Sequence, residues 1–137
     1  LREVVEQVGG GGRDGRAIRW LWIGGPMGSL MTPDEWDVPV CPAALHQRGF
    51  VLGHGGLVAV LEGDDPSELL ERTLAFFAEE SCGKCVPCSL GSQRAREVGA
   101  ALPQRGDAAQ RELEGTLRLA QRASLCAFGR LMPGPLL

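Results

Sequence analysis

Three cysteines, Cys82, Cys85 and Cys88, are separated from one another by two residues and constrain this chain more than any other feature. Thiols with this spacing around a tight loop can each reach a different corner of a [4Fe-4S] cubane, which leaves one iron without a ligand. Cys126 is the candidate for the fourth position. It lies 38 residues beyond Cys88, far enough for a helix, a turn and a second helix to bring the chain back. The cysteines therefore favour a helical fold that closes on a cysteine loop.

Other chemistry is open to the same residues. Structural zinc also uses cysteines, although usually as two separated C-x-x-C pairs. Disulfides fit a chain without an export signal less well. Cys41 is expected to be a spare thiol, and His46 and His54 to be loop or surface residues rather than ligands. The spacing favours a cluster and leaves zinc as the alternative.

Residues near the cysteines suit the surroundings of an anionic centre. Gly83 lets the backbone pass close to inorganic sulfide, and Pro87 stiffens the loop. Four thiolates on a cubane make a net negative group. Cations such as Lys84 and Arg94, and a helix N-terminus expected at Ser89, would therefore favour an added electron. We expect these residues to tune the cluster rather than to bind it.

Composition and charge limit the remaining possibilities. With 137 residues, 44% hydrophobic and 23% charged, the chain can form one ordinary domain or two small ones. The formal charge of −3, with Lys and Arg scattered, gives no footprint for nucleic acid. No apolar run approaches the roughly 20 residues of a membrane helix. We expect a cytoplasmic protein, free or peripheral on the cytoplasmic face of a membrane complex, without direct membrane insertion.

The part of the chain before residue 64 is rich in glycine and predicts short strands. Residues 1–8 have a helical spacing of apolar side chains. Residues 17–23 and 57–61 are rich in β-branched and aromatic side chains and predict strands. Residues 24–56 predict turns and a poorly patterned loop. One face of the first strand is expected to carry Ile18, Trp20 and Trp22.

The part of the chain after residue 64 predicts helices. Asp65 and Pro66 are typical of a helix start, and the helix should continue to about Glu80. Ser89 is expected to begin a second helix that reaches about residue 102, and Asp107 a third that leads to the last cysteine. The inward positions of the second helix are expected to be Leu90, Ala95, Val98 and Leu102.

The motif around the cysteines resembles a known family. Residues 80–88, Glu-Ser-Cys-Gly-Lys-Cys-Val-Pro-Cys, and residues 124–129, Ser-Leu-Cys-Ala-Phe-Gly, carry the resemblance together with glycine-rich segments at 24–26 and 52–56. They are similar to the C-terminal half of the NADH-binding flavoprotein subunit of respiratory complex I, which recurs in NAD-reducing hydrogenases and NAD-dependent formate dehydrogenases. The resemblance implies the cluster ligands Cys82, Cys85, Cys88 and Cys126.

The resemblance also implies a fold. We expect an α+β chain with a partial β-grasp domain of the soluble-ligand-binding (SLBB) type over residues 1–64. A helical bundle that carries the [4Fe-4S] cluster should follow over residues 65–137. The opening hairpin of the β-grasp and the last helices of the bundle have no match, as expected of an excerpt from something longer. Ser89 stands where the family usually has Arg after the third cysteine.

A function follows from the same resemblance. The cluster is expected to relay single electrons from a flavin, reduced by NADH, to further iron-sulfur centres. FMN and NAD(H) should lie on a partner domain or subunit, and ferredoxin-like iron-sulfur subunits should be further partners. Nothing in the chain matches the flavin domain, so the chain alone should not oxidise NADH. The alternative is a non-catalytic scaffold or binding module in which zinc only holds the helices together.

Overall fold

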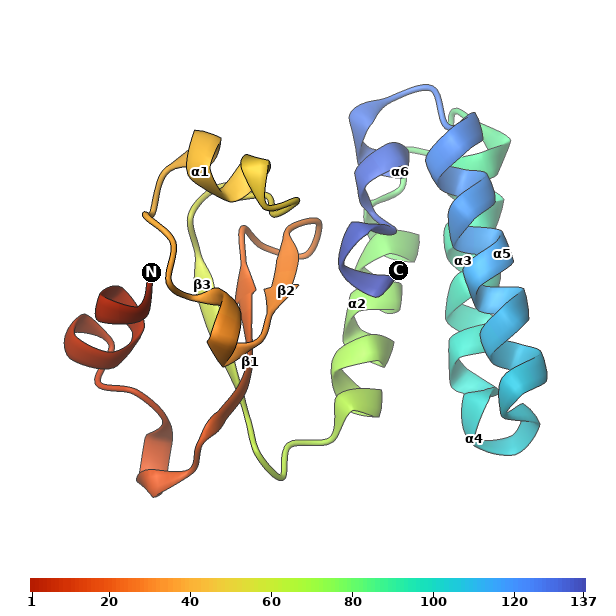
Figure 1. Cartoon of the computed structure of the whole chain (residues 1–137). Coiled ribbons are helices and arrows are strands. Elements are labelled where there is room, and N and C mark those ends of the chain that lie inside the picture. The colour runs from red at the N-terminus through yellow and green to blue at the C-terminus, as the bar shows by residue number, and fades with distance from the viewer. The chain divides into compact units, whose positions relative to one another are not determined.

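A computed structural model describes all residues from 1 to 137, and the chain divides into two compact units, Leu1–Asp64 and Asp65–Leu137. The first unit holds the strands and the second holds the long helices (Figure 1). The predicted α+β class is confirmed. None of the helices combines the length and the hydropathy needed to span a membrane.

The first unit is built on a three-stranded antiparallel sheet with the strand order β2-β1-β3. Its strands are β1 (Ile18–Ile23), β2 (Ser29–Met31) and β3 (Leu57–Leu61). Leu21 is central to the sheet, because it stands opposite Met31 on one side and Ala59 on the other. The strands predicted over 17–23 and 57–61 are confirmed.

Four short helical segments surround this sheet: η1 (Val4–Val8), η2 (Arg13–Gly15), η3 (Pro33–Glu35) and α1 (Pro42–Gln47). The predicted first helix is present, although η1 has the wider turns of a π-helix. The prediction of an irregular chain over 24–56 is wrong in part, because β2, η3 and α1 all fall within it. A capping box at Thr32 begins η3, and the Thr32 N–H donates to Glu35 Oε2 at 2.7 Å. Elements this short leave no periodic pattern in a sequence.

One hydrophobic core fills the first unit. Its buried side chains come from η1, the sheet and α1 and are Leu1, Val5, Leu21, Ile23, Met31, Trp36, Val38 and Leu45. Ile18 packs against the same cluster as Leu21 and Ile23. The predicted face of Ile18, Trp20 and Trp22 is therefore wrong, because the register of β1 shifts between Ile18 and Trp20.

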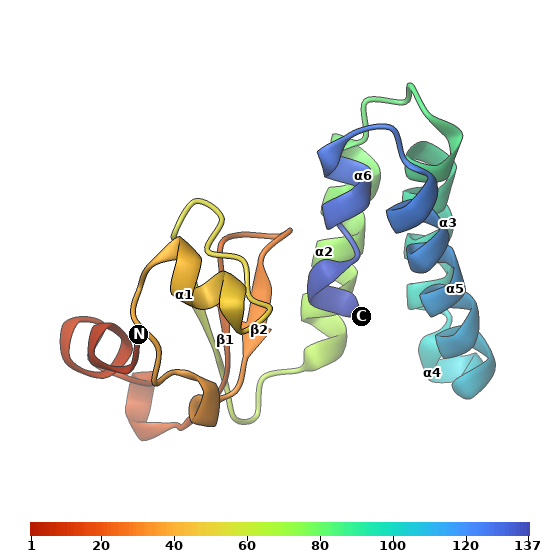
Figure 2. The same ribbon diagram turned by 45° about the horizontal axis from the view of Figure 1, so that its top comes forward.

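The second unit is a helical bundle (Figure 2). Its elements are α2 (Pro66–Glu80), α3 (Val86–Ala100), α4 (Leu102–Arg105), α5 (Asp107–Ala123), α6 (Ala127–Leu131) and η4 (Gly134–Leu136). Helix α3 packs against both α2 and α5, and α6 packs against α5. The buried cluster between these helices contains Leu74, Ala95, Val98, Ala109, Leu113 and Leu117.

Helix α2 forms where the sequence predicts it. The Asp65 side chain accepts a hydrogen bond from the Ser67 N–H at 2.8 Å, and Pro66 occupies the first turn, where its missing N–H needs no partner. Glu68 pairs with Arg72 one turn later at 2.6 Å. Local signals are therefore sufficient to start this helix.

Helix α3 begins earlier than predicted. It starts at Val86, with Cys85 at the N-cap position, so the predicted start at Ser89 is wrong. Pro87 is accepted in the first turn, and the Ser89 hydroxyl lies inside the helix and donates to the Cys85 carbonyl at 3.1 Å. The cysteine loop therefore ends at Cys85, and Cys88 is a helical residue.

The predicted inward face of α3 is correct at Ala95 and Val98 and wrong at Leu90. Ala95 and Val98 are fully buried, whereas 58% of Leu90 is exposed. The buried stripe passes through Ser92, and Gly91 faces α5, where a Cβ on Gly91 would lie 3.6 Å from the Ala120 Cβ. The close approach of α5 at these small residues leaves Leu90 on the outside.

Ion pairs join α3, α4 and α5 around Glu112. Its carboxylate accepts hydrogen bonds from Arg105 at 2.7 Å and from Arg94. Arg105 and then Arg94 hold the pKa of Glu112 below its ordinary value of 4.5. The contribution of these pairs to stability is therefore present above about pH 4.5 and is lost as the pH falls through the lower pKa of the folded state.

Replacing Glu112 with Gln should remove this part of the pH dependence. We expect a small loss of thermal stability at neutral pH, because exposed ion pairs contribute little, and a loss that shrinks towards zero below the pKa of the folded state. Melting temperatures of the wild type and Glu112→Gln, compared from acid to neutral pH, test this expectation. A difference that stayed constant across that range would contradict it.

Candidate metal centre

The four cysteines predicted as ligands all lie at helix ends or in connecting loops of the second unit. Cys82 lies in the loop after α2, Cys85 and Cys88 lie at the start of α3, and Cys126 is the N-cap residue of α6. The α2–α3 and α5–α6 connections lie at the same end of the bundle (Figures 1 and 2). The predicted return of the chain to the cysteine loop is therefore present.

The Cys88 thiol is the buried member of the four predicted ligands, with 3% of the residue exposed. Burial raises the pKa of the Cys88 thiol, and the neighbouring thiols of Cys85, Cys126 and Cys82 raise it further, while the Ser81 hydroxyl lowers it. Ser81 Oγ lies 3.4 Å from Cys88 Sγ. Each of the other three predicted ligands is thus near enough to Cys88 to act on the charge of its thiol.

Backbone N–H groups are directed at the Cys85 sulfur. The N–H of Leu125, and then that of Cys88, lowers the pKa of the Cys85 thiol and favours its thiolate. Because Leu125 immediately precedes Cys126, the first of these contacts connects the two cysteine-bearing loops. The same N–H groups can stabilise negative charge on a sulfur ligand.

Ser124 and Gly129 pack tightly against the Cys88 side chain and are called the floor of the site. Ser124 is buried, and its Oγ has no hydrogen-bond partner. A Cβ on Gly129 would collide with the Ser124 side chain and would lie 3.0 Å from the Cys88 Cβ. Arg130 holds the same loop, because its Nε donates to the Ser124 carbonyl at 2.9 Å. The Ser124 hydroxyl also lowers the pKa of the Cys85 thiol, so it faces a predicted ligand and can support negative charge on that sulfur.

Replacing Gly129 with Ala should therefore destabilise the bundle by roughly 1–3 kcal/mol, because the added methyl group overpacks the floor of the site. Gly115→Ala in α5 is the matched control. No atom lies within 4 Å of its added Cβ, so alanine should be neutral or stabilising there. Chemical denaturation followed by circular dichroism compares the two variants. Equal stability changes would contradict the packing argument.

The four thiols form a donor set that fits an iron-sulfur cluster. Cysteine thiolates are the ligands of such clusters, and each one binds a separate iron at one corner of the cubane. No three His, Cys, Asp or Glu side chains of the chain come together as a group that could hold one metal ion. A cubane makes a different demand, because its ligands surround a volume instead of meeting at one point.

The other residues considered from the sequence belong to the first unit or are already paired. Cys41 is a free, partly exposed thiol at the start of α1, in the first unit. His46 belongs to α1, and His54 Nδ1 accepts a hydrogen bond from the Gly56 N–H at 3.0 Å. Arg94 pairs with Glu97 and Glu112, which offset its charge.

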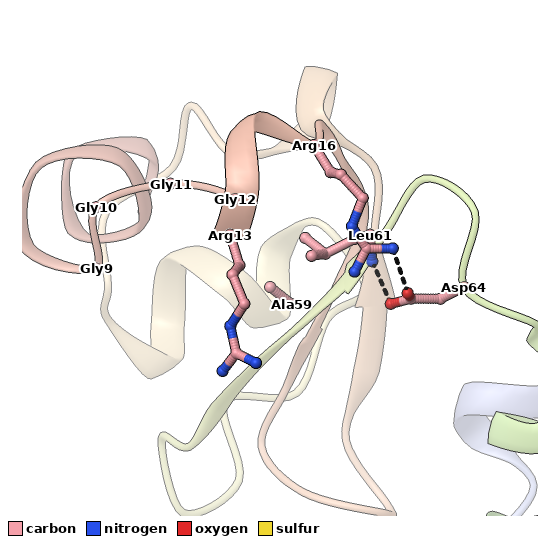
Figure 3. Close-up of a pocket in the computed structure, with 9 residues that line it drawn as sticks. All are labelled: Gly9, Gly10, Gly11, Gly12, Arg13, Arg16, Ala59, Leu61 and Asp64. Atoms are coloured by element: carbon pink, nitrogen blue, oxygen red, sulfur yellow. Dashed lines mark hydrogen bonds and ion pairs between the residues drawn. The ribbon is translucent and has the colours of Figure 1, made fainter.

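A hollow in the first unit is separate in its chemistry. It has a volume of about 530 Å³, and Arg16 pairs with Asp64 at its rim at 2.7 Å (Figure 3). Its lining residues are Gly9, Gly10, Gly11, Gly12, Arg13, Arg16, Ala59, Leu61 and Asp64. None of them is a thiol or an imidazole, so this hollow contributes no ligand to a cluster.

Sequence reasoning missed the residues that support the cysteines. Ser81, Ser124 and Gly129 contact or underlie Cys88, and the Leu125 N–H reaches Cys85. Their only signal was their position inside the two cysteine motifs. Their roles depend on how the α5–α6 connection returns to the loop, which no local pattern specifies.

Known proteins contain regions that are similar in sequence to this chain. The family model described as the NADH-ubiquinone oxidoreductase-F iron-sulfur binding region matches residues 68–137. The NADP-reducing hydrogenase subunit HndC of Solidesulfovibrio fructosivorans is 33% identical over 139 residues, which cover 100% of this chain and 28% of that protein. An NADH-quinone oxidoreductase subunit of Rhizobium meliloti (strain 1021), designated F 2, is 35% identical over 91 residues, which cover 66% of this chain and 22% of that protein.

A solved structure extends the likeness to the fold. The chain superimposes on a chain of an NAD+-reducing [NiFe]-hydrogenase in the H2-reduced state with a TM-score of 0.74, at 24% identity, over 87% of this chain and 20% of that one. The chain thus spans less than a third of each of these proteins. The resemblance inferred from the cysteine motif is confirmed, and the chain belongs to the family of NADH-ubiquinone oxidoreductase-F iron-sulfur binding regions.

Proposed function

We propose that this chain is the electron-relay part of an NAD(H)-linked oxidoreductase and holds one [4Fe-4S] cluster on Cys82, Cys85, Cys88 and Cys126. The observation that carries the proposal is that the α2–α3 and α5–α6 connections, which bear the cysteines, lie at one end of the bundle (Figures 1 and 2), where the Leu125 N–H next to Cys126 reaches the Cys85 sulfur. Membership of an iron-sulfur binding family supports it. The family's cofactor is a [4Fe-4S] cluster, and such a cluster, when bound, takes up and releases single electrons.

The residues around the thiols have supporting roles in this proposal. The N–H groups of Leu125 and Cys88 donate towards the Cys85 sulfur and offset its negative charge. Such hydrogen bonds to sulfur are among the factors that set a cluster's potential. Phe128 of α6 packs edge-on against Phe77 of α2, with ring centroids 6.2 Å apart, which fixes α6 close to Cys126. The protein thus holds its ligands in place and excludes water from Cys88.

The remainder of the oxidoreductase belongs to other domains or subunits in this proposal. The two relatives named above are subunits of a hydrogenase and of an NADH-quinone oxidoreductase, and both are several times longer than this chain. We assign FMN and NAD(H) to a partner domain or subunit, and the electron acceptor to ferredoxin-like iron-sulfur subunits. Residues 1–64 would be the β-grasp domain and residues 65–137 the cluster-binding bundle. A cytoplasmic location is part of the same proposal.

Metal analysis and an absorption spectrum of the anaerobically purified chain test the cofactor. We expect about four irons and four sulfides per chain, with brown absorbance near 400 nm that bleaches on reduction, as iron-sulfur charge transfer requires. A scaffold that uses structural zinc would instead be colourless, because zinc has no redox chemistry or d–d absorption. One zinc per chain without sulfide would overturn the proposal.

A further inference from the structure

An exposed apolar patch lies at the cysteine-bearing end of the bundle. Val86 and Leu90 of α3 are 67% and 58% exposed, Leu119 of α5 is 62% exposed, and Leu125 is 77% exposed. These four side chains are called the apolar patch below. Single exposed leucines are ordinary on a protein surface, whereas apolar side chains that gather in one place mark interaction sites.

Helix geometry places the four side chains together. Val86 and Leu90 are one turn apart on the same face of α3. Helices α3 and α5 run in opposite directions and approach each other at Gly91 and Ala120. Leu90 and Leu119 each precede one of these contact residues, so they project on the same side of the helix pair. The Leu125 backbone meets Cys85, which immediately precedes Val86.

Charge around the apolar patch is mostly positive. Residues 81–93 and 115–137 contain no Asp or Glu, although the whole chain has 17 acidic residues and a net charge of −3. The same segments contain Lys84, Arg118, Arg122 and Arg130. Lys84, Arg118 and Arg122 are exposed and pair with no carboxylate, whereas Arg130 donates to the Ser124 carbonyl. Glu79 and Glu80, at the end of α2, are the nearest acidic residues before Ser81, and Glu79 pairs with Arg96. The cysteine-bearing end therefore carries more cations than carboxylates in a chain whose net charge is −3.

An apolar centre with a charged rim is the usual anatomy of a protein interface. A patch of four side chains is small, and weak electron-transfer encounters are among the smallest specific interfaces. Cations alone could serve to offset an anionic cluster. Offsetting the charge of a cluster does not require exposed apolar side chains among the cations. The side chains of the apolar patch are exposed, so they do not contribute to the core of the bundle either.

We propose that the apolar patch and its cations, Lys84, Arg118 and Arg122, dock an electron-transfer protein whose own docking surface is acidic around an apolar centre. This inference rests on the proposed function, because a relay of electrons requires a protein partner to approach the cysteine centre closely. Opposite charges on the two surfaces accelerate the encounter and orient it, and the apolar contact holds the pair together.

Binding of a small acidic [2Fe-2S] ferredoxin to the full 137-residue chain tests the proposal. We expect weak binding at low salt that weakens steeply as ionic strength rises. Replacing Leu90 and Leu119 together with Gln should weaken binding by about tenfold, since central apolar contacts dominate interfaces. Arg118→Gln with Arg122→Gln should weaken binding several-fold and flatten its dependence on salt.

Matched controls separate the apolar patch from general surface effects. Val8→Gln removes an apolar side chain that is 80% exposed in the first unit. Arg111→Gln removes an exposed, unpaired cation from α5 two turns further from the cysteines than Arg118. Both variants should bind the ferredoxin as the wild type does, and iron content and the EPR spectrum should be unchanged in every variant.

The outcomes distinguish this inference from the function on which it rests. A chain that carries a full cluster but does not bind the ferredoxin would overturn the inference alone. So would Leu90 and Leu119 variants that bind like the wild type while the arginine variants do not, since binding would then be diffuse electrostatic attraction. A wild-type chain that takes up no iron and sulfide would overturn both.

Discussion

The variant Cys126→Ala should lose its [4Fe-4S] signal, with the EPR intensity of the reduced protein reduced by about tenfold or more. Three ligands from one loop and the first turn of α3 leave one iron of the cubane without a thiolate, and Cys126 is the remaining thiol that acts on Cys88 from outside that segment. Iron and sulfide contents per chain, measured after anaerobic reconstitution, should fall together with the EPR signal.

Cys41→Ala is the matched control for this loss. Cys41 is the one cysteine of the chain outside the proposed ligand set, and it belongs to the first unit, at the start of α1. Its removal should leave iron content, sulfide content and the EPR spectrum unchanged. A normal cluster in Cys126→Ala would remove Cys126 from the proposed ligands. Loss of the cluster in Cys41→Ala would mean that the ligand set has been chosen wrongly.

Local signals were sufficient for those elements whose ends are marked in the sequence. The Asp65 and Pro66 pair starts α2 at the predicted residue, and the β-branched run over 57–61 forms β3. In both cases the cause lies within a few residues: a side chain that accepts a backbone N–H, or side chains that suit a pleated sheet. Such elements need no knowledge of the rest of the fold.

Errors arose where a neighbouring element makes the choice. Leu90 has the right chemistry for a core position, yet the contact between Gly91 and Ala120 brings α5 to a different side of α3. The shift in register before Trp20 likewise depends on how β3 pairs with β1. Hydrophobic periodicity gives the presence of a helix or a strand, but its buried face depends on which partner arrives and at what distance.

The candidate site divides in the same way. Cysteine spacing selected Cys82, Cys85 and Cys88, because loop ligands must be close in sequence, and Cys126 was the candidate for the fourth position. The groups that hold those thiols come from the returning α5–α6 connection: the Leu125 N–H, the buried Ser124 and the small Gly129. Nothing in their own spacing distinguishes them from ordinary loop residues. Supporting residues of this kind become visible only when the fold is known.

The dependence of the site on packing leads to a second large effect, in Phe77→Ala. Phe77 is 1% exposed on α2, and its ring meets Phe128 of α6 edge-on. Removing the ring should destabilise the bundle by about 3–5 kcal/mol, since it leaves a cavity in a close-packed interior. The same loss should loosen α6 and Cys126 at its start, so cluster content should fall even though no ligand is changed.

Phe76→Ala serves as the control, because Phe76 is adjacent on α2 but only partly buried, and it should cost clearly less stability. Denaturation monitored by helical circular dichroism gives the stability change, and iron and sulfide analysis gives cluster content under native conditions. If Phe77→Ala lost stability and kept a full cluster, the cysteines would be held by their own loops. The contact between α2 and α6 would then have no part in placing Cys126.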